Sequence, residues 1–406
     1  PRLADTDLDQ FEDARDNCPA VFNHDQGDRD ADGVGNLCDP DFATHSVMLA
    51  DQNGNGHPEL AVLSRSPNGS WRIDVVDTVS GERVQRYQAL GGRWTARDMA
   101  LLSDDGRQEL VVLATHENGQ IQASIFDSRR GTRRDAFDFL GRQWQAVDLA
   151  VVQRLNAKGE KAIAVLGRKS DGTIQAHIRN AVTGDLVRMT RFFNASWQPR
   201  RLLAISDING DRAEELVVLG EHASGRIATQ IKTARGGFGL RTDDYFGPSW
   251  RFRDVVDLGD ANGRGYDELA VLAQRRNGQH AVIVRNAGTG RELADIRFDG
   301  GDWSASRLGS IADANDSGAR ELTIVAQRND GRINVLVKDA LDGTNVGRQR
   351  FLGGAWSPQS LVVLPQVGRR GAIGLGLVAT RGSDGRIRME AKEAVTGRDV
   401  AAVWIR

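Results

Sequence analysis

Three loops in this chain carry oxygen-bearing side chains at a spacing that suits a bound metal ion. The clearest reads Asp207-Ile-Asn-Gly-Asp-Arg-Ala-Glu-Glu215, with side-chain oxygens at positions 1, 3, 5 and 9. Ca²⁺ takes six to eight oxygen ligands on a sharply turning backbone, so this spacing favours calcium. The candidate ligands are Asp207, Asn209, Asp211 and Glu215 in this loop, Asp51, Asn53, Asn55 and Glu59 in an earlier one, and Asp313, Asn315, Ser317 and Glu321 in a later one. The alternative is that these Asp-x-Asn segments are only favourable β-turns.

The first 41 residues hold a second set of candidate metal ligands. They contain twelve acidic residues and three arginines, for a net charge of about −9. A segment with so few apolar side chains cannot build a hydrophobic core and needs another source of order. Alternating carboxylates supply the hard oxygen ligands that calcium prefers. We therefore predict calcium ligation by Asp5, Asp7, Asp9, Asp13, Asp16, Asp28, Asp30, Asp32, Asn36 and Asp39.

The same acidic segment contains both cysteines of the chain, Cys18 and Cys38. A single disulfide that closes the segment is the simplest interpretation of this spacing. The alternative is a disordered acidic tail with two free thiols.

The rest of the chain repeats with a period of about 53 residues. Asn-Gly and Asp-Gly turns keep this period, and short runs rich in Val, Ile and Leu lie between them. Such turns join antiparallel strands, and each repeat offers four short strands and no helix. Seven such units predict an all-β fold, a seven-bladed β-propeller of four-stranded antiparallel blades. The tryptophans that mark the period are Trp94, Trp144, Trp197, Trp250, Trp303 and Trp356.

These patterns divide the chain into two domains. We place a small calcium-wrapped, disulfide-closed loop segment at residues 1–41 and the propeller at residues 42–406. No strand is left over to cross between the first and last repeats, so we expect the ring to close by side-chain packing alone. The predicted repeats span about residues 43–93, 94–143, 144–196, 197–249, 250–302, 303–355 and 356–406.

Both domains resemble known families. The pattern DNCP…D-x-D-x-D-G-x-G-x-x-C-D resembles a thrombospondin type 3 repeat over about residues 5–39. That resemblance implies calcium-wrapped loops with a disulfide in a secreted or surface protein. The loops that begin at Asp51 and Asp207 resemble the calcium loops of FG-GAP repeats in integrin-alpha-like propellers, over about residues 44–406.

Basic residues suggest where a ligand could bind. Residues 42–406 carry a net charge of about +7, mostly from arginine, which favours an anionic partner if the side chains cluster. Arg200, Arg201 and Arg253 lie near the starts of predicted innermost strands, from which they could reach one mouth of the channel. These three arginines are our candidate ligand-binding residues.

The sequence favours a binding function without deciding against catalysis. The seven histidines form no recognisable metal-ligand pair, and no nucleophile motif is present. The leading hypothesis is a calcium-binding recognition or adhesion module, secreted or at the cell surface, that binds a glycan or a protein. An anionic polysaccharide is one such candidate ligand. The alternatives are a carbohydrate-active enzyme such as a polysaccharide lyase and a purely structural spacer.

The expected setting follows from the same features. We expect several calcium ions, no nucleic-acid partner, no membrane span, and a monomeric fragment of a larger modular protein.

Overall fold

Short apolar strands, four in each sequence repeat, are the building elements of this chain. The computed structural model describes residues 5, 11–19, 45–66, 68–104, 106–275, 277–298, 302–328, 330–354, 356–367, 372–381 and 384–405. Within these ranges the regular secondary structure is entirely β, with 28 strands and no helix.

The strands group into seven blades in chain order. Blades 1 to 3 are β1 (His45–Leu49), β2 (Glu59–Arg65), β3 (Trp71–Asp77), β4 (Arg83–Leu90); β5 (Trp94–Asp104), β6 (Arg107–His116), β7 (Ile121–Asp127), β8 (Arg133–Phe139); and β9 (Trp144–Val152), β10 (Ala162–Lys169), β11 (Ile174–Asn180), β12 (Leu186–Phe192). Blades 4 and 5 are β13 (Trp197–Ile205), β14 (Glu215–His222), β15 (Ile227–Thr233), β16 (Gly239–Phe246); and β17 (Trp250–Asp257), β18 (Glu268–Arg275), β19 (His280–Asn286), β20 (Glu292–Phe298). Blades 6 and 7 are β21 (Trp303–Ile311), β22 (Glu321–Arg328), β23 (Ile333–Asp339), β24 (Asn345–Arg350); and β25 (Trp356–Val367), β26 (Ala372–Arg381), β27 (Ile387–Glu393), β28 (Asp399–Trp404).

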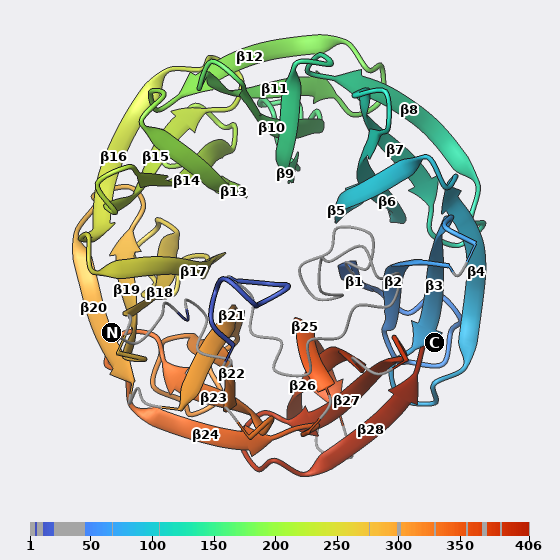
Figure 1. Cartoon of the computed structure of the whole chain (residues 1–406), viewed down its shortest axis with the longest axis vertical. Helices are drawn as coiled ribbons and strands as arrows, with labels where there is room; N and C mark the ends of the chain where they lie inside the picture. The colour runs from blue at the N-terminus through green and yellow to red at the C-terminus, as the bar shows by residue number, and fades with distance from the viewer. Residues whose placement is uncertain are drawn as a thin grey trace.

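Each blade is a four-stranded antiparallel sheet whose strands pair in sequence order. The first strand of every blade lies beside the central channel and the fourth lies at the rim (Figure 1). The predicted fold class is therefore confirmed: the chain is an all-β, seven-bladed propeller.

The hydrophobic core lies between neighbouring blades. The second strand of each blade is apolar and buried on both faces, as in β14, because a blade stacks against each side of it. One cluster joins Leu166 and Phe192 of blade 3 to Trp197 and Leu216 of blade 4. The fourth strands lie at the rim and are more exposed than the second strands, as β16 is compared with β14.

An apolar residue four positions before a repeat tryptophan fills the inner part of several blade junctions. We call Leu90, Leu140, Phe193, Phe246 and Leu352 the plug residues. Phe193 stacks on Trp197 with ring centroids 4.3 Å apart. A Cβ atom added at Gly167 would overlap the end of the Leu140 side chain, so this glycine leaves room for the plug of blade 3.

The ring closes between blade 1 and blade 7 without sharing a strand. The first sheet has the order β1-β2-β3-β4 and the last has β25-β26-β27-β28. Leu60 and Val62 of blade 1 pack with Leu364, Met389 and Val403 of blade 7. Among the described residues no strand is shared across this junction, as expected, and the hydroxyl groups of Ser46 and Ser360 also form a hydrogen bond across it.

Only part of the acidic segment belongs to the described residues. Residues 11–19 include a turn in which the backbone N–H groups of Arg15 and Asp16 donate to the carbonyl of Glu12. Cys18 is 1% exposed, and its N–H donates to Asp16 Oδ1 at 2.7 Å. The predicted ligands and cysteine outside the described residues are Asp7, Asp9, Asp28, Asp30, Asp32, Asn36, Asp39 and Cys38. The calcium ligation and the disulfide of this segment stay predictions.

Candidate functional site

The three predicted calcium loops share one backbone geometry. In the Asp207 loop (residues 207–215), the first carboxylate accepts N–H groups from Gly210 at 2.7 Å and from Arg212 at 2.7 Å. In the Asp51 loop (residues 51–59), Asp51 likewise accepts N–H groups at positions 4 and 6, and Asp313 accepts one at position 6 of its own loop (residues 313–321). Each loop therefore wraps around its first carboxylate.

This wrapping requires a left-handed backbone at positions 4 and 6. Glycine holds both positions in the Asp51 loop, where φ is 81° and 87°. Arg212 at position 6 of the Asp207 loop has a φ of 67°, and Asp316 at position 4 of the Asp313 loop has a φ of 59°. Side chains are disfavoured in this region by about 1–2 kcal/mol, so two of the loops hold their shape against local strain.

The glutamate at position 9 closes each loop from inside the blade. Glu59, Glu215 and Glu321 are fully buried. Glu215 Oε2 accepts the N–H of Ile208 at 2.8 Å, and Glu59 and Glu321 accept the corresponding N–H of their own loops. This contact is the structural role that the glutamates fill whether or not a metal binds.

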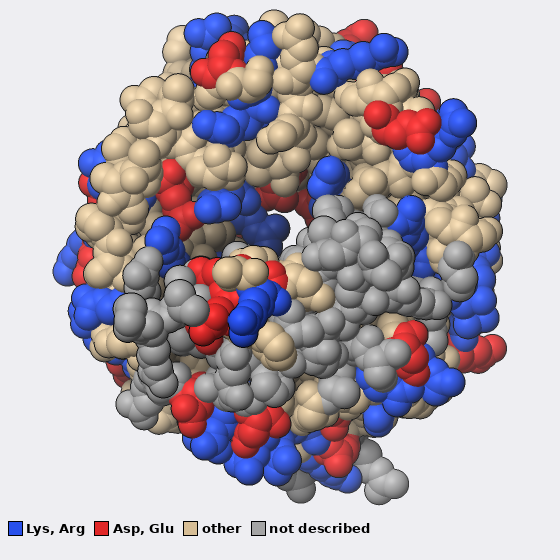
Figure 2. Space-filling view, viewed as in Figure 1, with Lys and Arg blue, Asp and Glu red and all other residues tan. Residues whose placement is uncertain are grey.

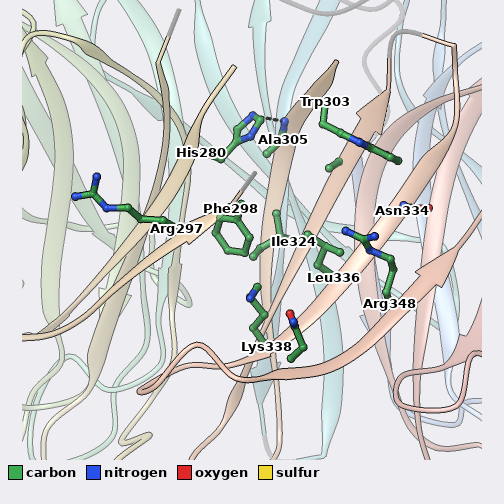
Figure 3. A pocket seen from close by; sticks show the side chains of 12 residues that line it. His280, Arg297, Phe298, Trp303, Ala305, Ile324, Asn334, Leu336, Lys338 and Arg348 are labelled. Carbon is green, nitrogen blue, oxygen red and sulfur yellow. Dashed lines mark hydrogen bonds between the residues drawn. The ribbon is translucent and has the colours of Figure 1, made fainter. Parts of the chain in front are cut away.

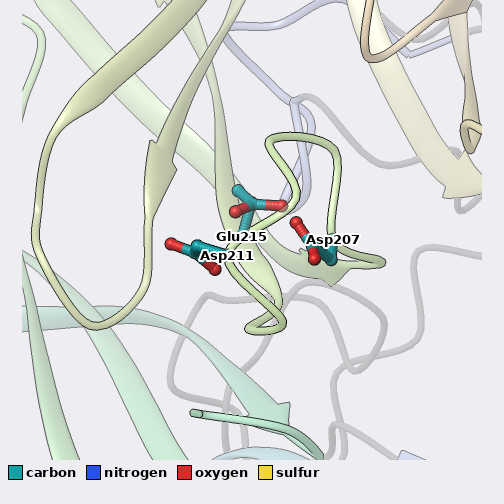
Figure 4. Close-up of side chains that lie close together, drawn as sticks. All are labelled: Asp207, Asp211 and Glu215. Atoms are coloured by element: carbon teal, nitrogen blue, oxygen red, sulfur yellow. The ribbon is translucent and has the colours of Figure 1, made fainter. Parts of the chain in front are cut away.

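Three carboxylates converge in the Asp207 loop (Figure 4). Oxygens of Asp207, Asp211 and Glu215 lie within 4.8 Å of one another, and among the described residues this is the only such group of three acidic or metal-ligating side chains. The side-chain amide of Asn209 donates to Glu215 Oε1 at 2.6 Å and lies 3.4 Å from Asp211 Oδ2. A positively polarised group thus lies among the carboxylates, as expected of a place that favours a cation.

Electrostatics within this loop depend on burial and on the clustered charge. Burial, followed by the charges of Asp207 and Asp211, raises the pKa of Glu215 to about 8. Although burial acts to raise it, the backbone N–H groups of Arg212 and Gly210 hold the pKa of Asp207 below its ordinary value. A divalent cation would favour the ionised form of all three carboxylates. The all-oxygen donor set fits calcium.

Each of the other two loops has a third carboxylate, which lies outside the nine-residue motif seen in the sequence. The Asn55 side chain donates to Asp77 Oδ2 at 2.8 Å, and the Ser317 hydroxyl donates to Asp339 Oδ2 at 2.6 Å. Asp77 and Asp339 end the third strands of their blades. In the Asp207 loop the fifth position is itself acidic, and the third strand ends in Thr233.

Each of the three loops therefore combines three carboxylates, although their sources differ. The copy that begins at Asp260 has only two, Asp260 and Glu268, because Arg264 holds its fifth position and Asn286 ends its third strand. An alignment of the repeats that extended beyond the loops would have revealed this exchange.

A ring of polar and charged residues lines the channel at one level. In blades 2 to 7 the member lies four residues after the repeat tryptophan. In blade 1, which lacks this tryptophan, it lies at the equivalent position of the first strand. In blades 2 to 7 a β-bulge comes just before this residue, as between Pro199 and Arg201. A bulge re-aims the side chains that follow it. We call His45, Asp98, Asp148, Arg201, Asp254, Arg307 and Ser360 the channel ring.

Contacts within the channel ring connect adjacent blades. Arg201 lies 3.8 Å from an oxygen of Asp148 and 3.5 Å from an oxygen of Asp254. Asp148 Oδ2 also accepts the N–H of Leu202 at 2.7 Å, and Asp254 Oδ2 accepts the N–H of Leu308 at 3.0 Å. Acidic and basic atoms are visible inside the central opening (Figure 2).

Two acids of the channel ring, Asp98 and Asp148, have shifted pKa values. Burial raises the pKa of Asp148 well above its ordinary value, against the charge of Arg201 and together with that of Asp98. Burial also acts to raise the pKa of Asp98, but the hydrogen bond and charge of His45 hold it below its ordinary value.

The three predicted ligand-binding arginines are not brought together at one mouth. Arg201 belongs to the channel ring. Arg200, which the bulge turns the other way, donates to Glu221 Oε2 at 2.6 Å. Arg253 donates to Gln274 Oε1 at 2.9 Å. Two of the three thus bind side chains of their own blades.

The fold resembles solved structures of different proteins at low sequence identity. Hydrazine synthase from Kuenenia stuttgartiensis aligns with 14% identity and a TM-score of 0.56, over 86% of this chain and 95% of that one. BBS1N, solved in complex with ARL6DN, aligns with 13% identity and a TM-score of 0.56, over 89% of this chain and 96% of that one. The Dos1 propeller aligns with 11% identity and a TM-score of 0.50, over 84% and 80%.

These likenesses establish the propeller fold alone. No protein-family model matches the chain, and no curated protein matches it in sequence. None of the described segments forms a helix long and apolar enough to cross a bilayer.

Proposed function

We propose that this protein is a calcium-binding recognition module, secreted or displayed at the cell surface, that binds a glycan or a protein. The observation that carries the proposal is the set of three carboxylates in the Asp207 loop, within 4.8 Å of one another. Support also comes from the Asp51 and Asp313 loops, which combine three carboxylates from different positions.

The resemblances found in the sequence belong to the same proposal. Loops of the FG-GAP type would hold calcium in the propeller. A thrombospondin type 3-like segment would hold further calcium ions and a disulfide between Cys18 and Cys38. Both features are typical of extracellular proteins, since disulfides persist in oxidising compartments.

Thermal unfolding with calcium and with a chelator tests the metal assignment. Extracellular modules bind calcium with Kd values of about 10⁻⁴–10⁻³ M. Calcium at 10 mM should therefore raise the free energy of unfolding by about 1.5–3 kcal/mol for each occupied site. Glu215→Gln should remove one site's share of this gain. Glu160→Gln is the matched control, because Glu160 lies in the third repeat, where the loop lacks the acidic pattern. Equal melting temperatures with calcium and with chelator would contradict the assignment.

Recognition itself is tested by an array of glycans and by binding to candidate matrix proteins. The proposal is supported if this chain binds a glycan or matrix protein in calcium-containing buffer and an unrelated propeller does not bind it. A module that binds nothing would instead fit the structural spacer.

One observation favours the carbohydrate-active enzyme as a second candidate. Asp98 and Asp148 of the channel ring have pKa values shifted in opposite directions, and Arg201 lies beside Asp148. Carboxyl groups whose pKa values are pushed apart can divide the roles of acid and base. Incubation with uronic-acid polysaccharides should then give products with unsaturated-bond absorbance, and Asp148→Asn should abolish them. No product from any such polysaccharide would remove this candidate.

A further inference from the structure

A cavity of about 370 Å³ opens between blade 5 and blade 6. Figure 3 shows that side chains of both blades point into it. Its volume lies near the lower end of the range for small-molecule sites, which is about 300–1,000 Å³. Its lining includes His280, Phe298, Trp303, Leu336, Lys338 and Arg348.

The cavity lies at the junction where the sequence lacks an apolar plug residue. Position 299, four before Trp303, is aspartate, whereas each of the five plug residues is leucine or phenylalanine. Ala326, which lines the cavity, is the blade 6 counterpart of Gly167, the residue that Leu140 contacts in blade 3. A carboxylate is a poor filler for an apolar gap.

The residue that anchors the plug also differs at this junction. His177 Nδ1 accepts the N–H of Leu140 at 3.2 Å, and Gln230 Oε1 accepts the N–H of Phe193 at 2.8 Å. The equivalent residue on the third strand of blade 6 is Leu336, which has no acceptor atom. Leu336 therefore cannot form the contact that His177 and Gln230 form in blades 3 and 4.

Arg348 faces this cavity without an internal carboxylate. It lies directly across the sheet from Leu336. In blade 1 the equivalent pair is Arg86 and Asp74, which form an ion pair. Arg348 lines the cavity, and among the described residues no acidic group lies within 4 Å of its guanidinium (Figure 3).

The other walls offer one more cation, two aromatic faces and two amides. Lys338 Nζ lies 5.3 Å from the centre of the Phe298 ring and donates to the carbonyl of Gly343 at 3.0 Å. Trp303 is half-buried, and the side chains of Asn334 and Asn345 also line the space. The amides can both donate and accept hydrogen bonds.

His280 belongs to the frame of the cavity. It is 2% exposed, and its Nε2 accepts the N–H of Ala305 at 2.9 Å. Burial, with the charge of Arg253, lowers its pKa to about 3, so the ring is neutral at physiological pH. The histidine thereby links the third strand of blade 5 to the first strand of blade 6.

We propose that this cavity binds the carboxylated sugar unit of an acidic glycan, with the carboxylate held by Arg348. This inference rests on the proposed recognition function and names its ligand. A planar guanidinium accepts a carboxylate through two parallel hydrogen bonds. Aromatic faces such as Trp303 and Phe298 pack against the apolar face of a pyranose ring, while amides satisfy its hydroxyl groups.

The test measures binding of single sugars to the full chain in calcium-containing buffer, by calorimetry and saturation-transfer NMR. The probes are the methyl glycosides of glucuronic, galacturonic and N-acetylneuraminic acid, with methyl glucoside as the neutral comparison. At least one acidic probe should bind about tenfold or more tightly than methyl glucoside, the factor expected from about 1.4 kcal/mol of charge-assisted hydrogen bonding. Equal binding of all four probes would overturn the proposal.

Substitutions separate this cavity from other sites. Arg348→Gln should abolish the preference for acidic probes. Leu336→Asp should do the same while keeping the arginine, because it supplies the internal partner that Arg86 has in Asp74. Leu336→Asn, which adds polarity without charge, should retain the preference. Arg350→Gln, the same charge change on the same strand outside the cavity lining, is the matched control.

The outcomes also distinguish this inference from the proposed function. Glycan or protein binding that all four variants retain would overturn the cavity assignment and leave the recognition function standing. Failure of the wild-type chain to bind any array glycan, any single-sugar probe or any candidate protein would overturn both. Melting curves of each variant verify that the blades remain folded.

Discussion

Single residues show that the Asp51, Asp207 and Asp313 loops each have three carboxylates in or beside them, although these come from different positions. Asp77 supplies to the Asp51 loop the carboxylate that Asp211 supplies to the Asp207 loop. Since Asp211 lies within its loop whereas Asp77 ends the third strand of its blade, a local loop motif identifies only Asp211. Repeat-wide comparison of strand ends recovers the other.

The first prediction concerns Asp77. Asp77→Asn should weaken calcium binding at the Asp51 loop about as much as Asp211→Asn weakens it at the Asp207 loop, because each change removes one of three carboxylates. The expected loss is about tenfold in affinity or more, since ligand charge tunes the calcium affinity of such loops. Calorimetric titration of the two variants measures it. Unchanged affinity in Asp77→Asn would show that this carboxylate serves only to hold Asn55.

The second prediction concerns pH and Asp257, the last residue of β17. Burial, followed by the charge of Asp267, raises the pKa of Asp257 to about 7, although the N–H of Gly259 opposes the rise. Arg320 and Glu268 are the other charged groups that act on it. Because the folded-state pKa exceeds the ordinary value of 3.8, this carboxyl group adds stability that is fully present below about pH 3.8 and is lost as the pH rises through about 7.

Asp257→Asn should therefore gain stability relative to wild type between pH 4 and pH 8, by about 1–3 kcal/mol. The amide oxygen can still accept the Gly259 N–H, so the backbone contact is kept. Denaturant unfolding at several pH values measures the difference. Asp244 is an exposed acid on β16, so Asp244→Asn should change the free energy of unfolding by the same small amount at every pH. The prediction is contradicted if Asp257→Asn shows the same lack of pH dependence.

At the scale of strands, the β-bulge in the innermost strands decides which side chains enter the channel. Arg200 and Arg201 are adjacent in sequence, yet one binds Glu221 and the other joins the channel ring. Alternation along a regular strand cannot assign the two, because the bulge shifts the period by one residue. Such a bulge leaves no compositional mark comparable to an Asn-Gly turn.

The third prediction follows from the position of Arg201 between two acids. Arg201→Gln should lower the free energy of unfolding by about 1–3 kcal/mol, since it leaves Asp148 and Asp254 buried without their counter-charge. In the Arg201→Gln protein, Asp148→Asn should lower the free energy of unfolding less than it does in the wild-type protein. A double-mutant cycle measures this difference. Additive effects would show that the ring members do not interact.

The local elements were thus more predictable than the site. Turn residues and apolar runs predict four strands in each repeat, and the period predicts their assembly into a ring. The loop spacing identifies Asp207, Asp211 and Glu215, because all three lie within nine residues. The channel ring and the cavity by Arg348 depend on contacts between blades about 50 residues apart, which spacing within one repeat does not encode.

At the scale of the whole molecule, the junction of blades 1 and 7 differs from the other six because no connection between consecutive described strands crosses it. Opening the ring there requires only the loss of side-chain packing, whereas elsewhere the polypeptide tethers the blades. Met389, which is fully buried at this junction, is one of its largest side chains. The junction is therefore the expected place for local opening.

The fourth prediction concerns this opening. Met389→Ala should weaken the junction by about 2–4 kcal/mol and speed hydrogen exchange in β1, β2, β27 and β28 before other strands. Ile178→Ala, at the buried interface of blades 3 and 4, is the matched control and should speed exchange near its own site only. Uniform protection around the ring in both variants would contradict the expectation.

The same junction has a consequence during synthesis. Blade 1 leaves the ribosome first, but the residues that cover Leu60 and Val62 belong to the last blade. At about 5–20 residues per second, the nascent chain waits on the order of tens of seconds before Met389 and Val403 emerge. Throughout that interval an apolar blade face has no partner of its own chain. Biosynthesis of this ring therefore favours conditions in which a chaperone, or slow folding of the first blade, protects that face until the last blade arrives.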